Sequence, residues 1–476
     1  MPNFESAKIA FSFSTLQNTK SMSFFMPRFY DILFVFFAFL FLQSEILLAQ
    51  KKENIKQDTL SLVFVGDLMG HSSQFLYARQ AEGGYNFEPY FEMVKPYLSE
   101  ADFAIGNLET VLAGKTQNYS GYPQFNTPNA YADALKTAGF DLIVTTNNHS
   151  YDQLEAGILR TLDELEKRNL TPIGTYRNEK AQDSLVICTK KGISFALLAY
   201  TQFSNLPVPT SKKYLVNHIE IEKIEQDIKK ARKKGAEIVI IHLHWGQEYQ
   251  TLPNDYQKET TQAIIAAGAD IIIGGHPHVL QPIEKFKTQN GATLDSGLVA
   301  YSLGNFISAQ YWRYSTAGVM LRLELSKKEG KISLSRLACV PTWVLGGQKY
   351  APLKTYKVYP AGLEARFSQN RPLAHWLTVP FSANLDLLTP ALVRDMKEAY
   401  QDSQQILALY LKNQVQWDNW LVNPFFQLEP RKPTFNRLTT KQSLTFTEIK
   451  PQKQPVFQAF AGKKASKKSK KEKGKQ

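Results

Sequence analysis

Cysteine is nearly absent from this chain, whose 476 residues include only Cys188 and Cys339. Two isolated cysteines in apolar surroundings exclude a disulfide framework and a thiolate metal site as organising features. Histidine is also scarce, with 8 residues, yet His276 and His278 stand close together after the apolar run of residues 271–275. No internal repeat is visible.

The N-terminal segment lacks an apolar run long enough for an ordinary membrane-spanning helix. Its unbroken run, Ile32 to Leu42, has eleven residues and fits the apolar region of a signal peptide. We therefore interpret residues 1–50 as a signal peptide, with translation starting at Met22 or Met26; the alternative is an uncleaved N-terminal anchor. Either way we expect the remainder to be exported, to the periplasm or cell envelope or to the outer side of a membrane.

Acidic residues are almost missing from the other end of the chain. Residues 462–476 contain eight lysines and one glutamate, a net charge of +7 out of +13 for the whole chain. Such a segment buries no apolar surface and is predicted to be a disordered Lys-rich tail. It either keeps the protein soluble or tethers it to an anionic polymer or lipid. We expect no nucleic-acid partner for an exported protein.

Between these ends the composition is that of a folded protein, with 43% hydrophobic residues. Short apolar runs alternate with helical periodicities, which predicts an α/β fold with a mixed or parallel sheet. One helical stripe consists of Leu154, Ile158, Leu162 and Leu165. The expected strands are residues 60–66, 101–106, 140–146, 193–200, 237–245, 269–275 and 298–304, then 320–325 and 332–340.

Side chains with metal-binding chemistry follow six of these strands, at or just beyond the last apolar residues. In α/β sheets, sites form at the carboxyl ends of strands, so we expect these side chains to meet in space. Carboxylates, an Asn carbonyl and imidazoles suit Mn, Zn, Fe or Mg. A set of six or more ligands indicates two divalent ions bridged by one carboxylate. The residues are Asp67 and His71, Asn107 and Glu109, Asn147 to His149 with Asp152, His242 and His244, His276 and His278, and Asn305.

The two neighbouring histidines are the most informative of these pairs. Pro277 fixes the turn between them, so that each imidazole can face a different ion. Gly274 and Gly275 let the backbone approach the site closely. One histidine after a strand is more often structural than a ligand, and it is the whole set that carries the prediction. His218 follows no strand and is given no role.

Six motifs in this order, GDLMGH, GNLE, NNHSYD, HLHWGQEY, GGHPHVLQPIE and YSLGNF, resemble the CapA/PgsA family of capsule and poly-γ-glutamate biosynthesis proteins. The resemblance covers Leu60 to Phe306. That family is similar to the calcineurin-like metallophosphoesterases, which implies a four-layer α/β architecture, a β-sandwich flanked by helices. Periodicity alone does not separate this architecture from a doubly wound sheet.

The resemblance also implies roles for the matching residues. His149 matches a histidine that donates a proton to the leaving group, and we expect Asp152 to orient it. His71 lies four residues after Asp67, where the phosphoesterases have Asp-x-His, so His71 is a weaker candidate. His242 is the other weaker candidate, since it alternates with His244 on the strand and both side chains can face one side. The implied metal ligands are Asp67, Glu109 in the place of a bridging aspartate, Asn148, His244, His276 and His278.

These observations divide the chain into a family-like domain over residues 60–345 and a partly helical extension over 346–461. The extension has a helical face with Leu388, Leu392, Met396 and Tyr400, followed by an aromatic-rich stretch from Tyr410 to Phe426. This segment either packs on the domain, as helical-period aromatics usually do, or presents an apolar surface to a membrane partner or a glycan.

Two hypotheses for function follow. The first is a metal-dependent hydrolase that cleaves or transfers a phosphoryl- or amide-linked intermediate of a surface polymer. The second is a non-catalytic, metal-containing scaffold that binds and exports an anionic polymer. In both, the expected partners are an anionic surface polymer or its precursor and a membrane-bound capsule synthesis complex.

Overall fold

The computed structural model describes residues 59–347, 350, 353–361 and 389–410, and five helical residues near the N-terminus, namely 37, 41 and 43–45. Most of the predicted signal region, the aromatic residues after Tyr410 and the Lys-rich tail lie outside the described residues. Among the helices that are described, none is both long and apolar enough to cross a membrane. The chain divides into two compact units, Met1–Thr59 and the body that begins at Leu60.

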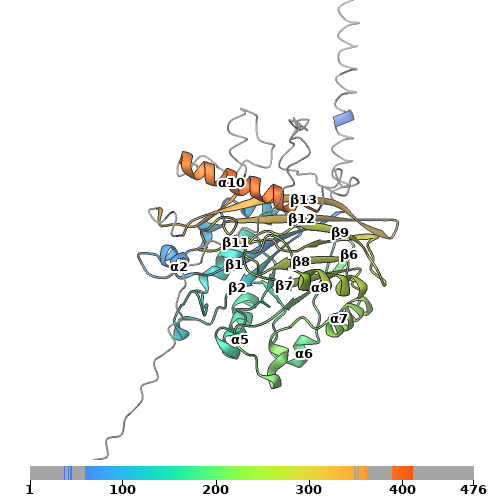
Figure 1. Cartoon of the computed structure of the whole chain (residues 1–476), viewed down its shortest axis with the longest axis horizontal. Coiled ribbons are helices and arrows are strands. Elements are labelled where there is room, and N and C mark those ends of the chain that lie inside the picture. Colours follow the sequence, from blue (N-terminus) through green and yellow to red (C-terminus); the bar gives the residue numbers. More distant parts are fainter. Residues whose placement is uncertain are drawn as a thin grey trace, which may run out of the picture. The chain divides into compact units, whose positions relative to one another are not determined.

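Two mixed β-sheets form the centre of the body (Figure 1). The first has the order β14-β13-β12-β1-β2-β3-β4, with β11 beside β1. Its strands are β1 (Thr59–Met69), β2 (Phe103–Glu109), β3 (Leu142–Val144), β4 (Thr171–Ile173), β11 (Asn305–Ile307), β12 (Ala317–Lys328), β13 (Lys331–Leu345) and β14 (Lys357–Pro360). The second sheet has the order β5-β6-β7-β8-β10-β9. Its strands are β5 (Ile187–Lys190), β6 (Ile193–Thr201), β7 (Ile238–His244), β8 (Ile271–Gly275), β9 (Ile283–Lys287) and β10 (Ser296–Ala300).

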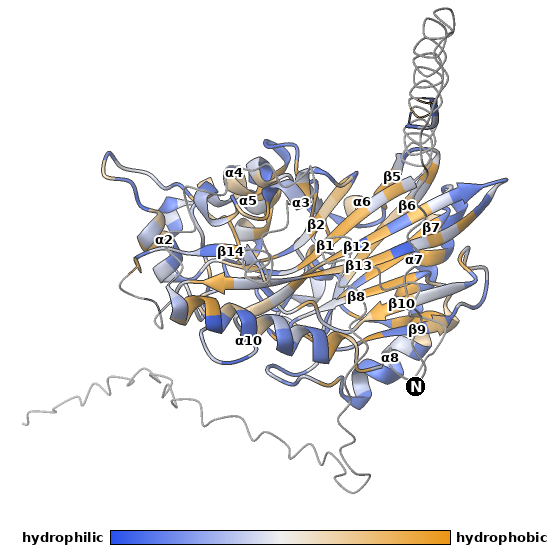
Figure 2. Cartoon of the chain, turned by 90° about the horizontal axis from the view of Figure 1, so that it is seen from above, coloured by the Kyte–Doolittle hydropathy of each residue, from blue (hydrophilic) through white to orange (hydrophobic). Residues whose placement is uncertain are grey.

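Alternation along the strands decides which side chains face which layer. In β1, Leu62 and Phe64 enter a core that also contains Ile240 of β7 and Ile273 of β8, so the two sheets pack face to face. Val63 points to the opposite side, into a second core. This period of two follows from the pleat of a strand. Because both faces are buried, the strands are apolar over most of their length, as Figure 2 shows.

Helices cover the outer face of each sheet. Leu98 of α3 (Lys95–Ser99) and Leu135 of α4 (Ala130–Ala138) pack on the first sheet. Ile228 of α7 (Ile221–Lys233) and Ile264 of α8 (Asp255–Ala266) pack on the second. The order helix, sheet, sheet, helix confirms the four-layer sandwich and excludes a single doubly wound sheet. The other helices are α2 (Ser72–Ala78), η1 (Glu88–Tyr90), η2 (Lys115–Gln117), α5 (Leu154–Glu166), α6 (Glu179–Gln182), η3 (Thr210–Leu215) and α10 (Pro390–Leu407).

All nine expected strands are present in the described residues, but one helical prediction was wrong in part. Leu154 is 56% exposed and has a left-handed backbone, with φ 56°. It begins α5 at a sharp turn, so it does not share the buried stripe of Ile158 and Leu162. The hydrophobic period therefore starts one turn later than the sequence indicates.

The segment after residue 345 returns to the body. β14 pairs antiparallel with β13, and α10 buries Leu392 and Met396 against Trp343 of β13. The described part of the predicted helical face therefore packs on the domain; Leu388 lies outside the described residues.

Candidate metal centre

The register of three neighbouring strands places the first group of polar residues. Asp67 is paired with Asn107 on β2 and with Asn305 on β11. Glu109 is the last residue of β2 and lies opposite Met69. Asp67 lies inside β1, Asn107 lies inside β2 and Asn305 begins β11, so these three do not follow a strand as the sequence indicated. The strands still bring them to one edge, because β1, β2 and β11 run parallel.

The ends of strands in the second sheet position the histidines beside Asp67 and Glu109. His244 ends β7 and is paired with Gly275, the last residue of β8. Beyond β8 the chain turns sharply: His276 has φ 96° and His278 has φ 58°. Left-handed backbone is costly for residues other than glycine, and such strain concentrates at functional sites. The backbone N–H of His276 donates to Asp67 Oδ2 at 3.3 Å, which fixes the turn against the first sheet.

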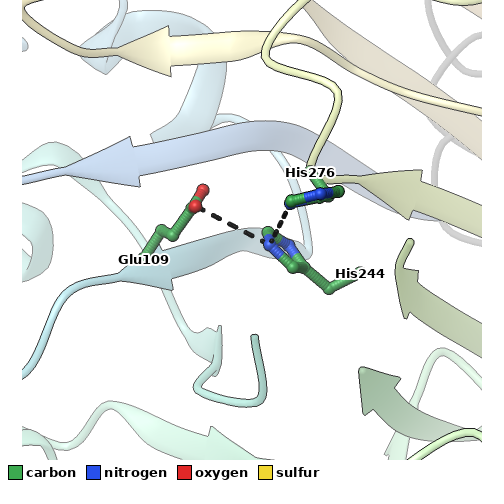
Figure 3. Close-up of side chains that lie close together, drawn as sticks. All are labelled: Glu109, His244 and His276. Carbon is green, nitrogen blue, oxygen red and sulfur yellow. Dashed lines mark hydrogen bonds and ion pairs between the residues drawn. The ribbon is translucent and has the colours of Figure 1, made fainter. Parts of the chain in front are cut away.

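Ligand atoms gather in two groups that share Glu109. The first consists of Glu109, His244 and His276, whose ligand atoms all lie within 4.8 Å of one another (Figure 3). His244 Nε2 is 3.6 Å from Glu109 Oε1 and 3.2 Å from His276 Nδ1. Asn148 Oδ1 joins this group at 2.8 Å from His244 Nε2. The atoms are spaced like ligands of one ion.

The second group consists of Asp67, Glu109 and His278. His278 Nδ1 lies 3.3 Å from Asp67 Oδ2, and its Nε2 lies 3.6 Å from Glu109 Oε1. Asn305 Oδ1 lies 3.1 Å from His278 Nδ1. The structure therefore brings together all six residues that the sequence indicated as metal ligands.

Burial of the Glu109 carboxyl is unfavourable in free energy. Its side chain is fully buried, and neither carboxyl oxygen has a hydrogen-bond partner in the described residues. Burial, reinforced by the charge of Asp67, raises the pKa of Glu109 well above its usual range. A buried carboxyl without partners costs free energy. A divalent cation would supply the missing partner, so the donor set fits one.

Two of the three imidazoles, those of His244 and His276, favour their neutral forms. Burial, with the nearby His276 and His278, lowers the pKa of His244 well below its usual value. Burial and His278 lower the pKa of His276 to about 3. Burial opposes charge on His278 too, but Asp67 raises its pKa. Neutral imidazole has the free lone pair that a metal ion needs.

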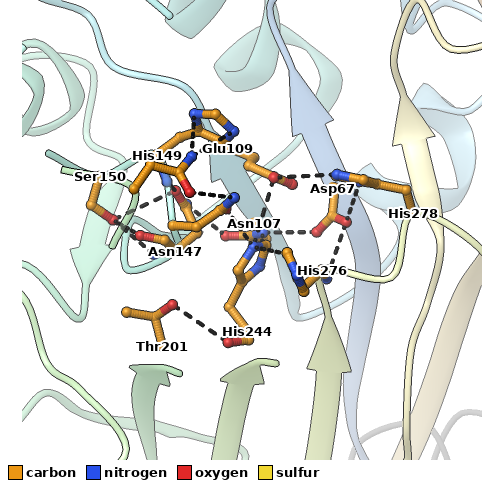
Figure 4. Close-up of polar contacts among 12 residues, drawn as sticks. Asp67, Asn107, Glu109, Asn147, His149, Ser150, Thr201, His244, His276 and His278 are labelled. Carbon is orange, nitrogen blue, oxygen red and sulfur yellow. Dashed lines mark hydrogen bonds and ion pairs between the residues drawn. The ribbon is translucent and has the colours of Figure 1, made fainter. Parts of the chain in front are cut away.

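A histidine–carboxylate pair, His149 and Asp152, stands next to the ligand groups; Figure 4 shows His149 beside them. His149 Nδ1 is 2.7 Å from Asp152 Oδ2, and both side chains are buried. The backbone N–H of Phe125 donates to the same carboxyl oxygen at 2.7 Å, and its ring packs edge-on against His149 with centroids 4.6 Å apart. Asp152 is thus fixed by the backbone and in turn fixes His149, as the sequence led us to expect.

Two buried asparagines connect these groups. Asn107 Nδ2 donates to Asp67 Oδ1 at 2.8 Å. Asn147 Nδ2 donates to Asn107 Oδ1 at 3.1 Å, and Asn147 Oδ1 accepts from the backbone N–H of His149 at 3.0 Å. This chain of hydrogen bonds holds the ligand Asp67 and the loop of His149 in one fixed relation.

The sequence reasoning missed Asn205 and Phe203. Asn205 Nδ2 lies 3.3 Å from His149 Nε2, and the Phe203 ring lies edge-on to His276 with centroids 5.2 Å apart. Both stand just beyond the end of β6, on residues 202–209. The rule that sites form after strands would have found this segment, but it contains none of the usual metal ligands.

His71 and His242 stay outside both ligand groups. His71 caps α2, where its Nδ1 lies 3.3 Å from Gln74 Oε1 and accepts from the backbone N–H of Ala309 at 3.3 Å. His242 is buried in β7, and its Nδ1 has no partner among the described residues. The spacing of four residues from Asp67 carries His71 past the site and into a helix cap.

At Gly275 the backbone of β8 approaches the Asp67 carboxyl closely, and a substitution there tests whether this close approach is needed. A Cβ at this position would lie 2.8 Å from Asp67 Oδ1, closer than van der Waals contact allows. We expect Gly275→Ala to displace Asp67 and to weaken divalent-metal affinity by about 10- to 100-fold, measured by competition with a chelator. Gly84→Ala is the control: its φ of 79° makes an alanine strained there, but nothing lies within 4 Å of its added Cβ, so metal affinity should not change. Unchanged affinity in Gly275→Ala would contradict a role for this close approach.

The fold and the site define a four-layer α/β protein with a buried group of carboxylates and imidazoles. The family described as bacterial capsule synthesis protein PGA_cap matches residues 61–310, more than half of the chain. The chain is 32% identical over 282 residues to the PGA biosynthesis protein CapA of Bacillus subtilis, covering 58% of this chain and 70% of that protein. It is 29% identical over 278 residues to the capsule biosynthesis protein CapA of Bacillus anthracis, covering 57% and 65%.

The chain therefore belongs to the PGA_cap family of bacterial capsule synthesis proteins, which confirms the resemblance seen in the six motifs. Among solved structures, it is similar to calcineurin-like phosphoesterase YfkN of Bacillus subtilis, with a TM-score of 0.35, 14% identity and coverage of 73% of this chain and 98% of that one. The NAD nucleotidase of Haemophilus influenzae gives a TM-score of 0.37 at 16% identity, with 59% and 56% covered. The architecture described above rests on the strand order and not on these scores.

Proposed function

We propose that this chain is an exported, metal-dependent hydrolase or transferase that acts on an intermediate of a surface polymer, at a phosphoryl or amide linkage. The observation that carries the proposal is Glu109, a fully buried carboxyl with no hydrogen-bond partner in the described residues that belongs to both ligand groups. A side chain in that position is suited to bridging two divalent ions. Family membership supports the capsule context, and residues 26–50 of the sequence support export.

Each group has a defined part in this proposal. One ion would be held by Asp67, Glu109 and His278, the other by Glu109, Asn148, His244 and His276. A bound divalent cation would act as a Lewis acid toward a phosphoryl or acyl oxygen of the substrate.

His149 would move the proton. Asp152 engages Nδ1, and Nε2, which the Asn205 amide approaches at 3.3 Å, would exchange a proton with the leaving group of a bound molecule. Phe125 and Asp152 hold the ring in one orientation, so little reorganisation is needed at the moment of transfer. The side chain lines the cavity beside the ligand groups, where a substrate would lie.

The proposal predicts turnover that depends on metal. Protein treated with a chelator should lose hydrolysis of a chromogenic phosphodiester and regain it with Mn²⁺ or Zn²⁺, because the Lewis acid is removed and restored. The assay is paired with elemental analysis of the same samples, and a synthetic γ-glutamyl amide tests the other linkage. Stoichiometric metal without turnover on either substrate would favour the scaffold hypothesis, in which the site binds polymer and performs no chemistry.

A further inference from the structure

A cavity of about 980 Å³ opens beside the candidate metal centre. His149, His276 and Asn148 form part of its wall, and the segments after β6 and β7 form most of the rest. Ligand sites in proteins commonly enclose about 300–1,000 Å³, so the cavity has room for a segment larger than the reacting group alone. The side chains that line it therefore indicate the chemistry of the rest of the substrate.

Three aromatic rings line this cavity, and two of them are open to solvent. Tyr122 is 75% exposed and Phe203 is 37% exposed. Tyr249 lines the same cavity and packs edge-on against Trp312, with centroids 5.0 Å apart. Large aromatic side chains are normally buried, and an exposed group of them around one cavity indicates a binding surface.

The backbone of Tyr249 is strained. Its φ is 65°, in the left-handed region that bulky residues rarely adopt. Its backbone N–H donates to Pro277 O at 2.7 Å, and its hydroxyl accepts from Gln310 Nε2 at 3.2 Å. The turn of the two histidines therefore fixes the orientation of this ring relative to the candidate metal centre.

Besides the two histidines, the polar side chains of the wall are mainly amides and two carboxyls, Asp152 and Glu248. Gln124, Asn205, Gln247 and Gln250 are all exposed and line the cavity, and so does Glu248. None of the described lining residues is a lysine or an arginine. Away from the candidate metal centre, a chain with a carboxylate on every residue would meet Glu248 with no lysine or arginine among the described lining residues to balance it, which disfavours binding along that part of the wall.

We infer that the cavity binds an uncharged glycan segment of the surface-polymer intermediate, with only its reacting oxyanion placed at the candidate metal centre. The C–H faces of a sugar ring pack against aromatic rings such as Phe203 and Tyr122, and side-chain amides and a carboxylate both complement hydroxyl groups. This inference rests on the proposed function and narrows its substrate class, from any surface polymer to one that contains neutral sugar residues.

The test compares two probes of equal length on the full chain loaded with Mn²⁺. One is a neutral tetrasaccharide of β-linked N-acetylglucosamine, and the other is γ-linked tetraglutamate; isothermal titration calorimetry gives both affinities. We expect the tetrasaccharide to bind more tightly. Phe203→Ala and Tyr122→Ala should each weaken it about three- to ten-fold, the usual range for one stacking contact.

Matched variants keep the result interpretable. Tyr256→Ala removes an aromatic ring with the same 37% exposure as Phe203 from outside the cavity lining, and should leave the affinity unchanged. Phe203→Trp keeps an aromatic face and should retain binding, which separates lost stacking from lost folding. Glu248→Gln should not strengthen tetraglutamate binding beyond that of the tetrasaccharide.

Three outcomes would overturn the inference: tighter binding of tetraglutamate, no tetrasaccharide binding at millimolar concentration, or binding that is insensitive to both Phe203→Ala and Tyr122→Ala. Metal content is measured in each sample. Retained metal without saccharide binding overturns the glycan inference alone, whereas absent metal overturns the proposed function beneath it.

Discussion

Glu109→Ala should empty the candidate metal centre, whereas His71→Ala should leave it filled. Protein lacking residues 1–50 is expected to hold about two divalent ions per chain after gentle purification. Glu109 belongs to both ligand groups, so its loss should remove most of the metal. His71 lies in a helix cap and contacts Gln74 and Ala309 instead. Elemental analysis of the two variants and the wild type measures the difference.

A second readout separates ligand loss from misfolding. Ligands that bind only the folded state stabilise it, by about 2.7 kcal/mol at a hundredfold excess over Kd. Thermal unfolding with and without Mn²⁺ should therefore show a large increase in Tm for the wild type and for His71→Ala, and little for Glu109→Ala. Glu109→Gln, which keeps the side-chain volume, should behave like Glu109→Ala. A wild-type protein without stoichiometric metal, or an unchanged metal content in both Glu109 variants, would refute the two-ion site.

His149→Asn should keep the metal and the fold but lose turnover, by about 10²- to 10⁴-fold for a missing general acid. The reason is geometric: neighbouring side chains diverge, so Asn148 contacts His244 at 2.8 Å while His149 turns to Asp152 at 2.7 Å. The ring takes no part in either ligand group, and in the proposed function it would move a proton. Phosphodiester hydrolysis by the purified protein, and polymer output in cells, measure the effect.

His218→Asn is the matched control for His149→Asn. His218 is a half-buried histidine whose Nε2 lies 3.1 Å from Ser204 Oγ, outside both ligand groups, and its loss should leave turnover within about twofold of the wild type. Normal polymer output with His149→Asn, together with lost output on deleting residues 462–476, would retire the catalytic hypothesis in favour of the scaffold.

Much of the candidate site could be predicted because its chemistry is local in sequence. Short runs of β-branched apolar residues such as 238–241 favour buried strands. Asp67, Glu109, His244 and His276 carry their ligand atoms whatever the fold. Asn205 and Phe203 could not be found in this way. An amide and a phenyl ring have no distinctive chemistry until the end of β6 places them beside His149 and His276.

The sequence by itself determined the strands, the set of metal-binding residue types and the family, since each of these depends on short segments read in order. Only the tertiary structure decided that the strands divide into two sheets packed face to face, because the same apolar runs would suit one doubly wound sheet. It also decided that His71 turns into a helix cap while His278 meets Asp67 from 211 residues away. Contacts at that separation depend on the packing of both sheets, and no local pattern of residues encodes them.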